Sequence, residues 1–152
     1  MMLLSGLLTA PGPASSGDEA AGRLSRDIDV DVPGEVYGVQ TLGSWRDGSR
    51  AGTYRVVTLR GGLDHVQTVV VIQWMEQGLG QAVPSVVAAR RVEVLDDLGP
   101  IAVVAVQAMA VPKGLHVSIQ VRNAVSGEEG SVEAFAGAPG RLTSEYASAN
   151  KR

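Results

Sequence analysis

Apolar and polar residues alternate along much of the chain between residues 27 and 136, and Gly, Pro and Asp interrupt the alternation at short intervals. The segment Leu115–Ala124 is the clearest case, because every second residue is apolar: Leu115, Val117, Ile119 and Val121. The positions between them hold His116, Ser118, Gln120 and Arg122. A period of two predicts a β-strand with one face in the core and one in solvent. A register slip of one residue would bury the four polar side chains, so this strand should pair in one register.

Two longer runs, Thr53–Arg60 and His65–Met75, are joined by four residues that include two glycines. Both runs are rich in Val and Thr, and the pair predicts a β-hairpin. The second run is apolar in the middle of both faces, which indicates a central strand whose outer face is partly covered.

Further segments with strand character are Asp27–Val32, Val36–Leu42, Ser85–Leu95, Ile101–Val111 and Ser131–Ala136. Ile101–Val111 also contains helix-favouring Ala and Met, but its Val and Ile content and the turn residues at both ends favour a strand. Seven or eight strands without a long helix predict an all-β protein. The expected fold is an antiparallel two-sheet sandwich, immunoglobulin-like or related, and a closed β-barrel is the alternative.

The ends of the chain differ from this middle part. Residues 1–26 comprise the apolar leader Met1–Ala10 and a linker rich in Pro, Gly and Ser. Residues 27–136 form the expected sandwich domain. Residues 137–152 form a polar tail that is expected to fray. The leader is interpreted as the remnant of a signal peptide, as a disordered leader, or as a docked first element. The first interpretation predicts a periplasmic or secreted protein, and the alternative is a cytoplasmic one. No apolar run approaches the roughly 18 residues of a membrane span, so no transmembrane segment is expected.

Composition narrows the classes of function. The chain has one Phe, two Trp and three Tyr, so Val, Ala, Leu and Ile must fill most of the core. The absence of cysteine excludes disulfides, thiol catalysis and thiolate metal sites. A net charge of −3 without a basic block argues against nucleic-acid binding, which needs clustered Lys and Arg.

The Gly-rich segment Gly43–Gly52 is the most distinctive expected loop. Trp and Arg are frequent at binding hot spots, so Trp45, Arg46, Arg50 and Tyr54 are hypothesised to form a surface patch for a ligand or partner. The alternative is that Trp45 packs over the end of the sandwich, with Arg46 paired to Asp47 or another carboxylate. Trp74 is expected in the core.

Residues with catalytic or metal-binding chemistry are sparse. His65 and His116 fall on predicted strand faces and are expected to face solvent. Asp27, Asp29 and Asp31 share one strand face, where side chains are spread along a line instead of surrounding one ion. The chain has no GxSxG elbow and no phosphate-binding GK[ST] loop. We therefore expect no metal and no cofactor.

The sequence favours a noncatalytic, exported β-sandwich that acts as a binding, structural or assembly module for an unknown protein or cell-envelope partner. The alternative is a hydrolase-type enzyme whose site is assembled from loops distant in sequence. A third hypothesis is homo-oligomerisation by pairing of sheet edges. Lys113 and Lys151 are the only lysines, and lysine is a common protector of sheet edges.

Overall fold

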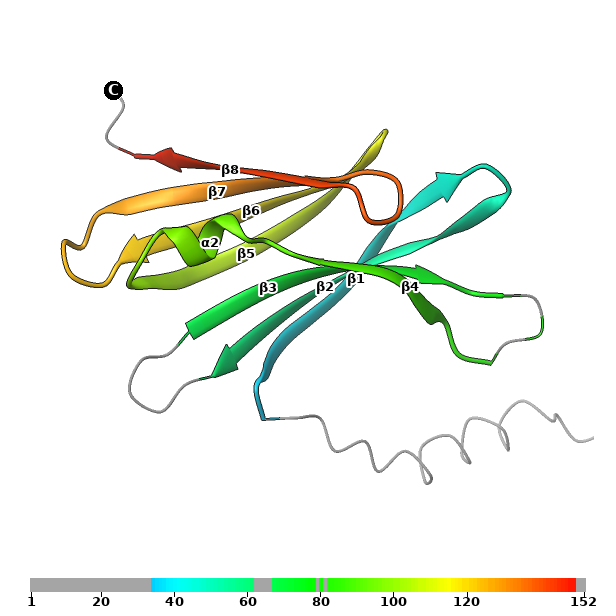
Figure 1. Cartoon of the computed structure of the whole chain (residues 1–152), viewed down its shortest axis with the longest axis horizontal. Helices are drawn as coiled ribbons and strands as arrows, with labels where there is room; N and C mark the ends of the chain where they lie inside the picture. The colour runs from blue at the N-terminus through cyan, green and yellow to red at the C-terminus, as the bar shows by residue number, and fades with distance from the viewer. Residues whose placement is uncertain (1–33, 62–66, 79, 81, 150–152) are drawn as a thin grey trace, which may run out of the picture. The chain divides into compact units, whose positions relative to one another are not determined.

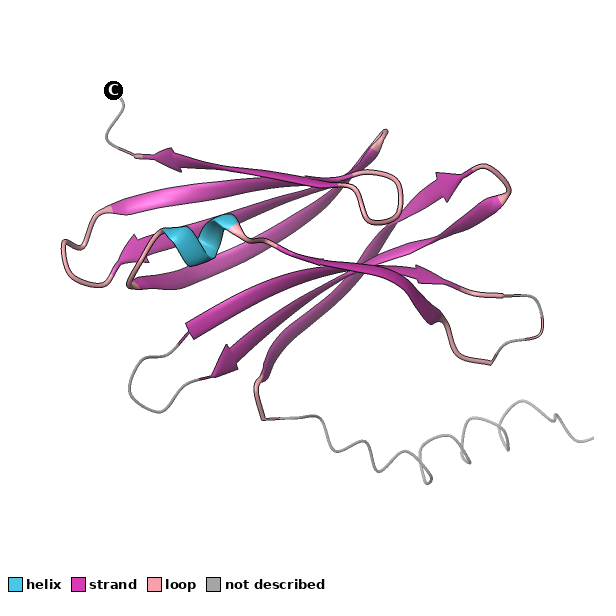
Figure 2. Ribbon diagram, in the orientation of Figure 1, coloured by secondary structure: helices cyan, strands magenta, loops and turns pink. Residues whose placement is uncertain are grey.

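The computed structural model describes residues 34–61, 67–78, 80 and 82–149, and these fold into two four-stranded antiparallel sheets (Figure 1). Sheet A has the strand order β1-β2-β3-β4 and sheet B the order β5-β6-β7-β8. The strands are β1 Val36–Asp47, β2 Arg50–Gly61, β3 Gln67–Glu76, β4 Ser85–Arg91, β5 Ile101–Val111, β6 Gly114–Asn123, β7 Glu129–Ala136 and β8 Leu142–Ser148. The short helix α2, Val94–Asp97, links the two sheets and is the only helix in the described part of the chain (Figure 2).

The predicted two-sheet sandwich is confirmed, and the sheets do not close into the alternative barrel. Each sheet is a meander, because strands adjacent in the chain are also adjacent in the sheet. Immunoglobulin domains instead distribute consecutive strands between their sheets through Greek-key connections. The confirmed class is therefore a two-sheet sandwich, and the meander order does not support the narrower immunoglobulin-like description.

The alternation of apolar residues explains how the two sheets share one core. On β6 the four apolar residues predicted to face inward are all buried. They meet inward-facing residues of sheet A, among them Val56, Val70 and Ile72. The hairpin predicted around residues 53–75 is confirmed as β2 and β3, and Ile101–Val111 is a strand as expected.

The segment Gly43–Gly52 is a hairpin end and not the predicted loop. β1 continues to Asp47, which pairs with Arg50, so the turn contains only Gly48 and Ser49. Gly48 has a φ of 60°, and no residue other than glycine has a positive φ among those described. This geometry matches a two-residue turn with Gly at its first central position. Gly43, with a φ of 64°, lies in a bulge of β1.

Two predicted boundaries are also wrong. The strand predicted to reach Leu95 ends at Arg91, because the chain turns into α2 and buries Leu95 in the core. Within the predicted tail, Leu142–Ser148 forms β8 and pairs with β7 in unbroken register. A polar composition is compatible with an edge strand, since such a strand has few buried side chains. The predicted leader, the linker and the strand Asp27–Val32 lie outside the described residues.

Candidate functional site

The hypothesised surface patch of Trp45, Arg46, Arg50 and Tyr54 is not an exposed aromatic surface. Trp45 is 3% exposed and Tyr54 1% exposed. The Trp45 indole Nε1 donates a hydrogen bond to the Thr53 carbonyl at 3.1 Å, and the Tyr54 hydroxyl donates to the Gly137 carbonyl at 2.9 Å. The burial of Trp45 agrees with the alternative interpretation, but the described residues show no ion pair of Arg46 with Asp47 or another carboxylate.

The two arginines of the patch have separate environments. Arg50 forms a bidentate ion pair with Glu76 of β3, with N–O distances of 3.1 and 2.9 Å. This contact raises the pKa of Arg50 and lowers the pKa of Glu76. Arg46 is exposed and lines a hollow of about 310 Å³ with Trp45 and Tyr54, whereas Arg50 does not. Because the aromatic faces are buried, this hollow offers a prospective ligand little apolar surface.

His116 contacts a carboxylate on the outer face of sheet B. Its Nε2 lies 3.0 Å from Glu133 Oε2, and the Ser118 hydroxyl donates to Glu133 Oε1 at 3.0 Å. In a Ser-His-acid triad the histidine stands between the other two and accepts the serine proton. Here the glutamate stands between, so this trio lacks the geometry that activates a serine.

A cleft of about 910 Å³ lies between the two sheets, at the end of the sandwich that holds α2. Its lining comes from the ends of β2 and β4, the starts of β3 and β5, α2, the connection between α2 and β5, and the turn after β6. The apolar lining consists of Leu95, Pro100, Ile101, Ala102, Val103 and Ala124. We call this hollow the end cleft.

Arg60 is one of the polar residues that line the end cleft. It lies at the end of β2, where the alternation directs it to the inner face together with Val56 and Thr58. Its guanidinium Cζ stands 4.0 Å from the centre of the Tyr37 ring, and Nη2 donates a long hydrogen bond of 3.5 Å to the Val103 carbonyl.

The charge of Arg60 is incompletely satisfied. Its Nε is buried without a hydrogen-bond partner, and no described carboxylate lies within ion-pair distance of it. Burial of an unpaired charge is costly, so buried cations normally have an anionic partner. Arg60 as a whole is half-buried, so this cost falls on its buried Nε and not on a fully buried cation.

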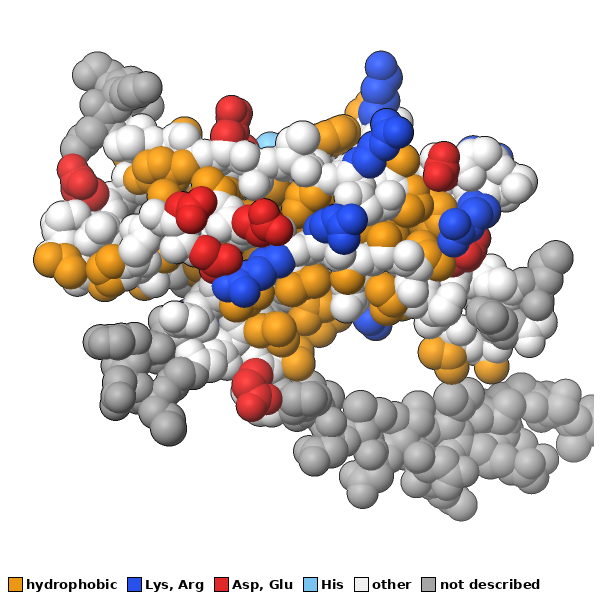
Figure 3. Space-filling model, in the orientation of Figure 1, with side chains coloured by type: hydrophobic (Ala, Val, Ile, Leu, Met, Phe, Trp, Pro, Cys, Tyr) orange, Lys and Arg blue, Asp and Glu red, His pale blue; other side chains and the backbone are white. Residues whose placement is uncertain are grey.

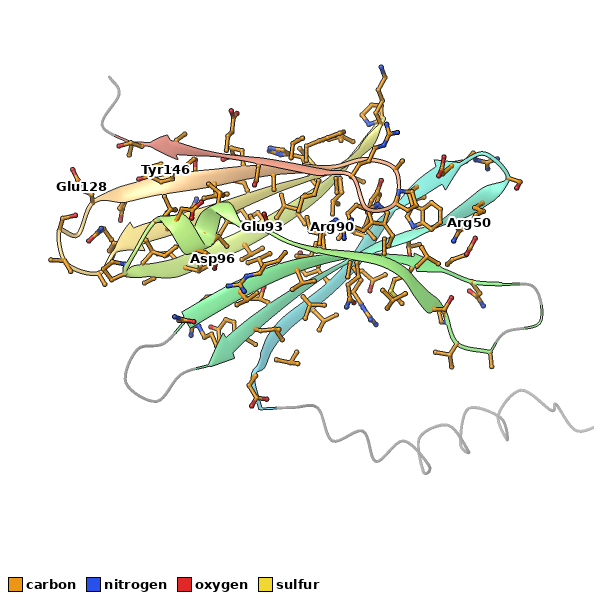
Figure 4. All side chains as sticks on the ribbon, viewed as in Figure 1. Arg50, Arg90, Glu93, Asp96, Glu128 and Tyr146 are labelled. Atoms are coloured by element: carbon orange, nitrogen blue, oxygen red, sulfur yellow. The ribbon has the colours of Figure 1, made fainter. Side chains whose placement is uncertain are left out.

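The rim of the end cleft is charged. Arg91 at the end of β4 pairs with Asp96 of α2. Figure 3 shows acidic and basic side chains on the face of the molecule that it draws, and Figure 4 labels Asp96 beside α2. Since Arg91 already has a carboxylate partner, it does not compete with Arg60 for an anion.

The sequence analysis missed Arg60, although the pattern contained the signal. In the run Thr53–Arg60, Arg60 falls on the same face as Tyr54, Val56 and Thr58. An arginine on a core-facing position near a strand end is unusual unless it reaches solvent or a partner. What the sequence could not supply was the opposite wall from β5, which determines whether a carboxylate is present.

Two further features bear on the chemistry of the described residues. Nowhere in this part of the chain do three or more His, Asp or Glu side chains converge where they could hold a metal ion. None of the described helices combines the length and the apolar character that a membrane span requires.

Comparison with known proteins identifies no relative: no family model matches the chain, and no curated protein or solved structure is significantly similar to it. The function must therefore be argued from the geometry of the described residues.

Proposed function

We propose that this protein is a noncatalytic binding module, and that the end cleft binds a small amphipathic carboxylate with its anionic group on Arg60. The observation that carries the proposal is the buried Arg60 Nε, which has no hydrogen-bond partner. Arg60 lines the end cleft, so a carboxylate bound there pairs with its charge.

The size and the lining of the end cleft support this class of ligand. A volume of about 910 Å³ lies within the range of ligand pockets, which is roughly 300–1,000 Å³. The six apolar residues of the lining come from α2, from β5 and from the connections before β5 and after β6, whereas the residues that sheet A contributes are polar. The apolar residues provide a surface for an aliphatic body, so a ligand with one charge and one apolar part matches both features.

The test uses dodecanoate as the probe and dodecanol as the uncharged probe of the same chain length. Calorimetric titration of the full chain is expected to give tighter binding of dodecanoate. Arg60→Met keeps an apolar side chain of similar length and should weaken dodecanoate binding by about tenfold or more, since a charged hydrogen bond contributes roughly 1.5–3 kcal/mol. Dodecanol binding should change little.

Arg55→Met is the matched control, because Arg55 also belongs to β2 but pairs with Gln73 at 2.7 Å on the outer face. Circular dichroism checks that both variants fold. Equal dodecanoate affinities for Arg60→Met and the parent chain, or no preference of the parent chain for dodecanoate over dodecanol, would contradict the proposal.

The proposed module is an exported protein. Support comes from the apolar leader Met1–Ala10 and the small residues that follow it. N-terminal sequencing of the protein recovered from each compartment of its host tests this point. A mature chain that begins near Ser15 outside the cytoplasm agrees with export, and an intact Met1 in the cytoplasm contradicts it.

A further inference from the structure

The two sheets have four edge strands, and three of the four edges are obstructed. An open edge exposes unpaired N–H and C=O groups, and proteins obstruct edges with bulges, charged side chains or covering segments. β1 contains two register shifts, and β4 contains one shift and ends with Arg90 and Arg91. These irregularities hinder the pairing of another strand with either edge.

The edge of β5 is covered by β1 and by the end of β2 of the other sheet. The Gln40 side-chain amide donates to the Val106 carbonyl at 3.4 Å, and Arg60 donates to the Val103 carbonyl at 3.5 Å. Gly43 lies so close to Ala110 that an added Cβ would stand 3.1 Å from the alanine Cβ. β5 has no charged residue, but these contacts occupy its free side.

Among the described residues, β8 is the edge strand with neither a bulge nor a covering strand, and it lies at the outside of sheet B (Figure 1). Its pairing with β7 is regular from Leu142 to Ser148, and every side chain from Thr143 to Ser148 is exposed. The Ala149 N–H donates to Glu129 of β7. Because the direction of the backbone groups alternates along a strand, the N–H groups of Ser144 and Tyr146 point to the free edge.

The negative charge of Glu145 determines which kind of strand can pair with the free edge of β8. Glu145 is the only charged residue of β8 and its central residue, and it stands opposite Glu133 of β7. Full-length antiparallel pairing of two copies of β8 would place Glu145 opposite Glu145 of the second copy. Like charges directly opposite each other destabilise a sheet, and the two Glu133 side chains would extend the acidic row.

We infer that β8 is an acceptor for an extended segment of a different protein, added antiparallel as a ninth strand, with a Lys or Arg opposite Glu145. The apolar residues of that segment lie on the other face, beside Leu142 and Tyr146, which point toward the interior of the sandwich. Backbone hydrogen bonds provide affinity in this mode of recognition, and the alternating side chains provide specificity.

The probe is the capped, fluorescein-labelled peptide Thr-Val-Thr-Val-Lys-Val-Thr-Val-Thr, with a control peptide that has Glu in place of Lys. By fluorescence anisotropy, the full chain should bind the lysine peptide at least tenfold more tightly than the glutamate peptide. Glu145→Lys should reverse this preference. Amide hydrogen exchange of Ser144 and Tyr146 should slow on binding of the lysine peptide.

Two modified probes test the backbone pairing without any change to the protein. N-methylation of the two valines that flank the lysine removes donors that face β8 and should abolish binding. N-methylation of the lysine, whose N–H points away from β8, should leave binding within about threefold. Equal binding of the lysine and glutamate peptides, binding of neither, or insensitivity to valine N-methylation would overturn the inference. Self-association of the free chain that slows exchange at Ser144 and Tyr146 would overturn it in favour of a homodimer.

Discussion

At the scale of single residues, hydrogen bonding explains which aromatic side chains are buried. Tyr54 and Trp74 both donate to the Gly137 carbonyl, at 2.9 and 2.8 Å, and their rings meet edge to face with centres 6.1 Å apart. Both residues belong to sheet A, whereas Gly137 follows β7 of sheet B. Since each polar atom has an acceptor, Tyr54 is buried at little cost and connects the two sheets.

Replacement of Tyr54 by Phe should reduce the stability of the protein at neutral pH and should remove part of its loss of stability at alkaline pH. Near pH 7, loss of the hydrogen bond to Gly137 should reduce the free energy of unfolding by about 1 kcal/mol. Burial raises the pKa of Tyr54 above its ordinary value of 10.0. Above pH 10 the unfolded chain therefore releases this proton more readily than the folded one, and the parent protein loses stability as pH rises. Tyr54→Phe removes that loss.

Urea unfolding at pH 7 to 11 measures the effect of Tyr54→Phe. Tyr146→Phe is the control, because Tyr146 is 42% exposed whereas Tyr54 is 1% exposed. The explanation fails if Tyr54→Phe loses stability above pH 10 as steeply as the parent protein.

At the scale of elements, the packing between strands decides the shape of the β1–β2 hairpin. Gly52 pairs with both Trp45 of β1 and Glu76 of β3. An added Cβ on Gly52 would lie 1.8 Å from the Met75 carbonyl oxygen and 2.8 Å from the Trp45 ring. The glycine therefore allows the strands to approach closely, and it does not mark a loop as the sequence analysis expected.

Gly52→Ala should consequently be strongly destabilising, by about 3 kcal/mol, at the upper end of the usual cost of overpacking. Gly34→Ala is the matched control, because an added Cβ on Gly34 meets no atom within 4 Å. Urea unfolding should show a large decrease in midpoint for the first variant and almost none for the second. Similar midpoints for the two variants would contradict the close packing at Gly52.

At the scale of the whole molecule, the two sheets share one core but differ on their outer faces. Sheet B has polar residues on its outer face, including Ser118, Gln120 and Glu133. The register places a group of aliphatic residues on the outer face of sheet A: Val39, Val57, Leu59, Val69 and Val71. The sequence had predicted apolar residues on both faces of β3, and the register extends this property to β1 and β2.

Because one cluster of buried residues contains the inner faces of both sheets, neither sheet should remain folded without the other. Both tryptophans are in sheet A, so their fluorescence reports its unfolding. Amide exchange of β6 reports the unfolding of sheet B. In urea the two signals should give one midpoint, as expected for a two-state domain. Protected β6 amides after loss of the tryptophan signal would show that the sheets unfold separately.

The sequence by itself determined the strand class of the fold and most of the strand positions. Side chains alternate between the two faces of a strand through local backbone geometry alone. The pattern therefore predicted a strand at Leu115–Ala124 and a hairpin of β2 and β3, and the structure confirms both. Local pattern did not reveal β8, because an exposed edge strand and a frayed tail can have the same polar composition.

Only the tertiary structure decided the environment of the functional candidates. Whether Trp45 is exposed depends on the strands around it, and Trp45 and Tyr54 proved to be buried. Whether Arg60 has an anionic partner depends on β5 and α2, which lie 34 or more residues further along the chain. Pairing between distant strands brings such groups together or keeps them apart, so sequence position alone cannot determine which polar atom remains without a partner.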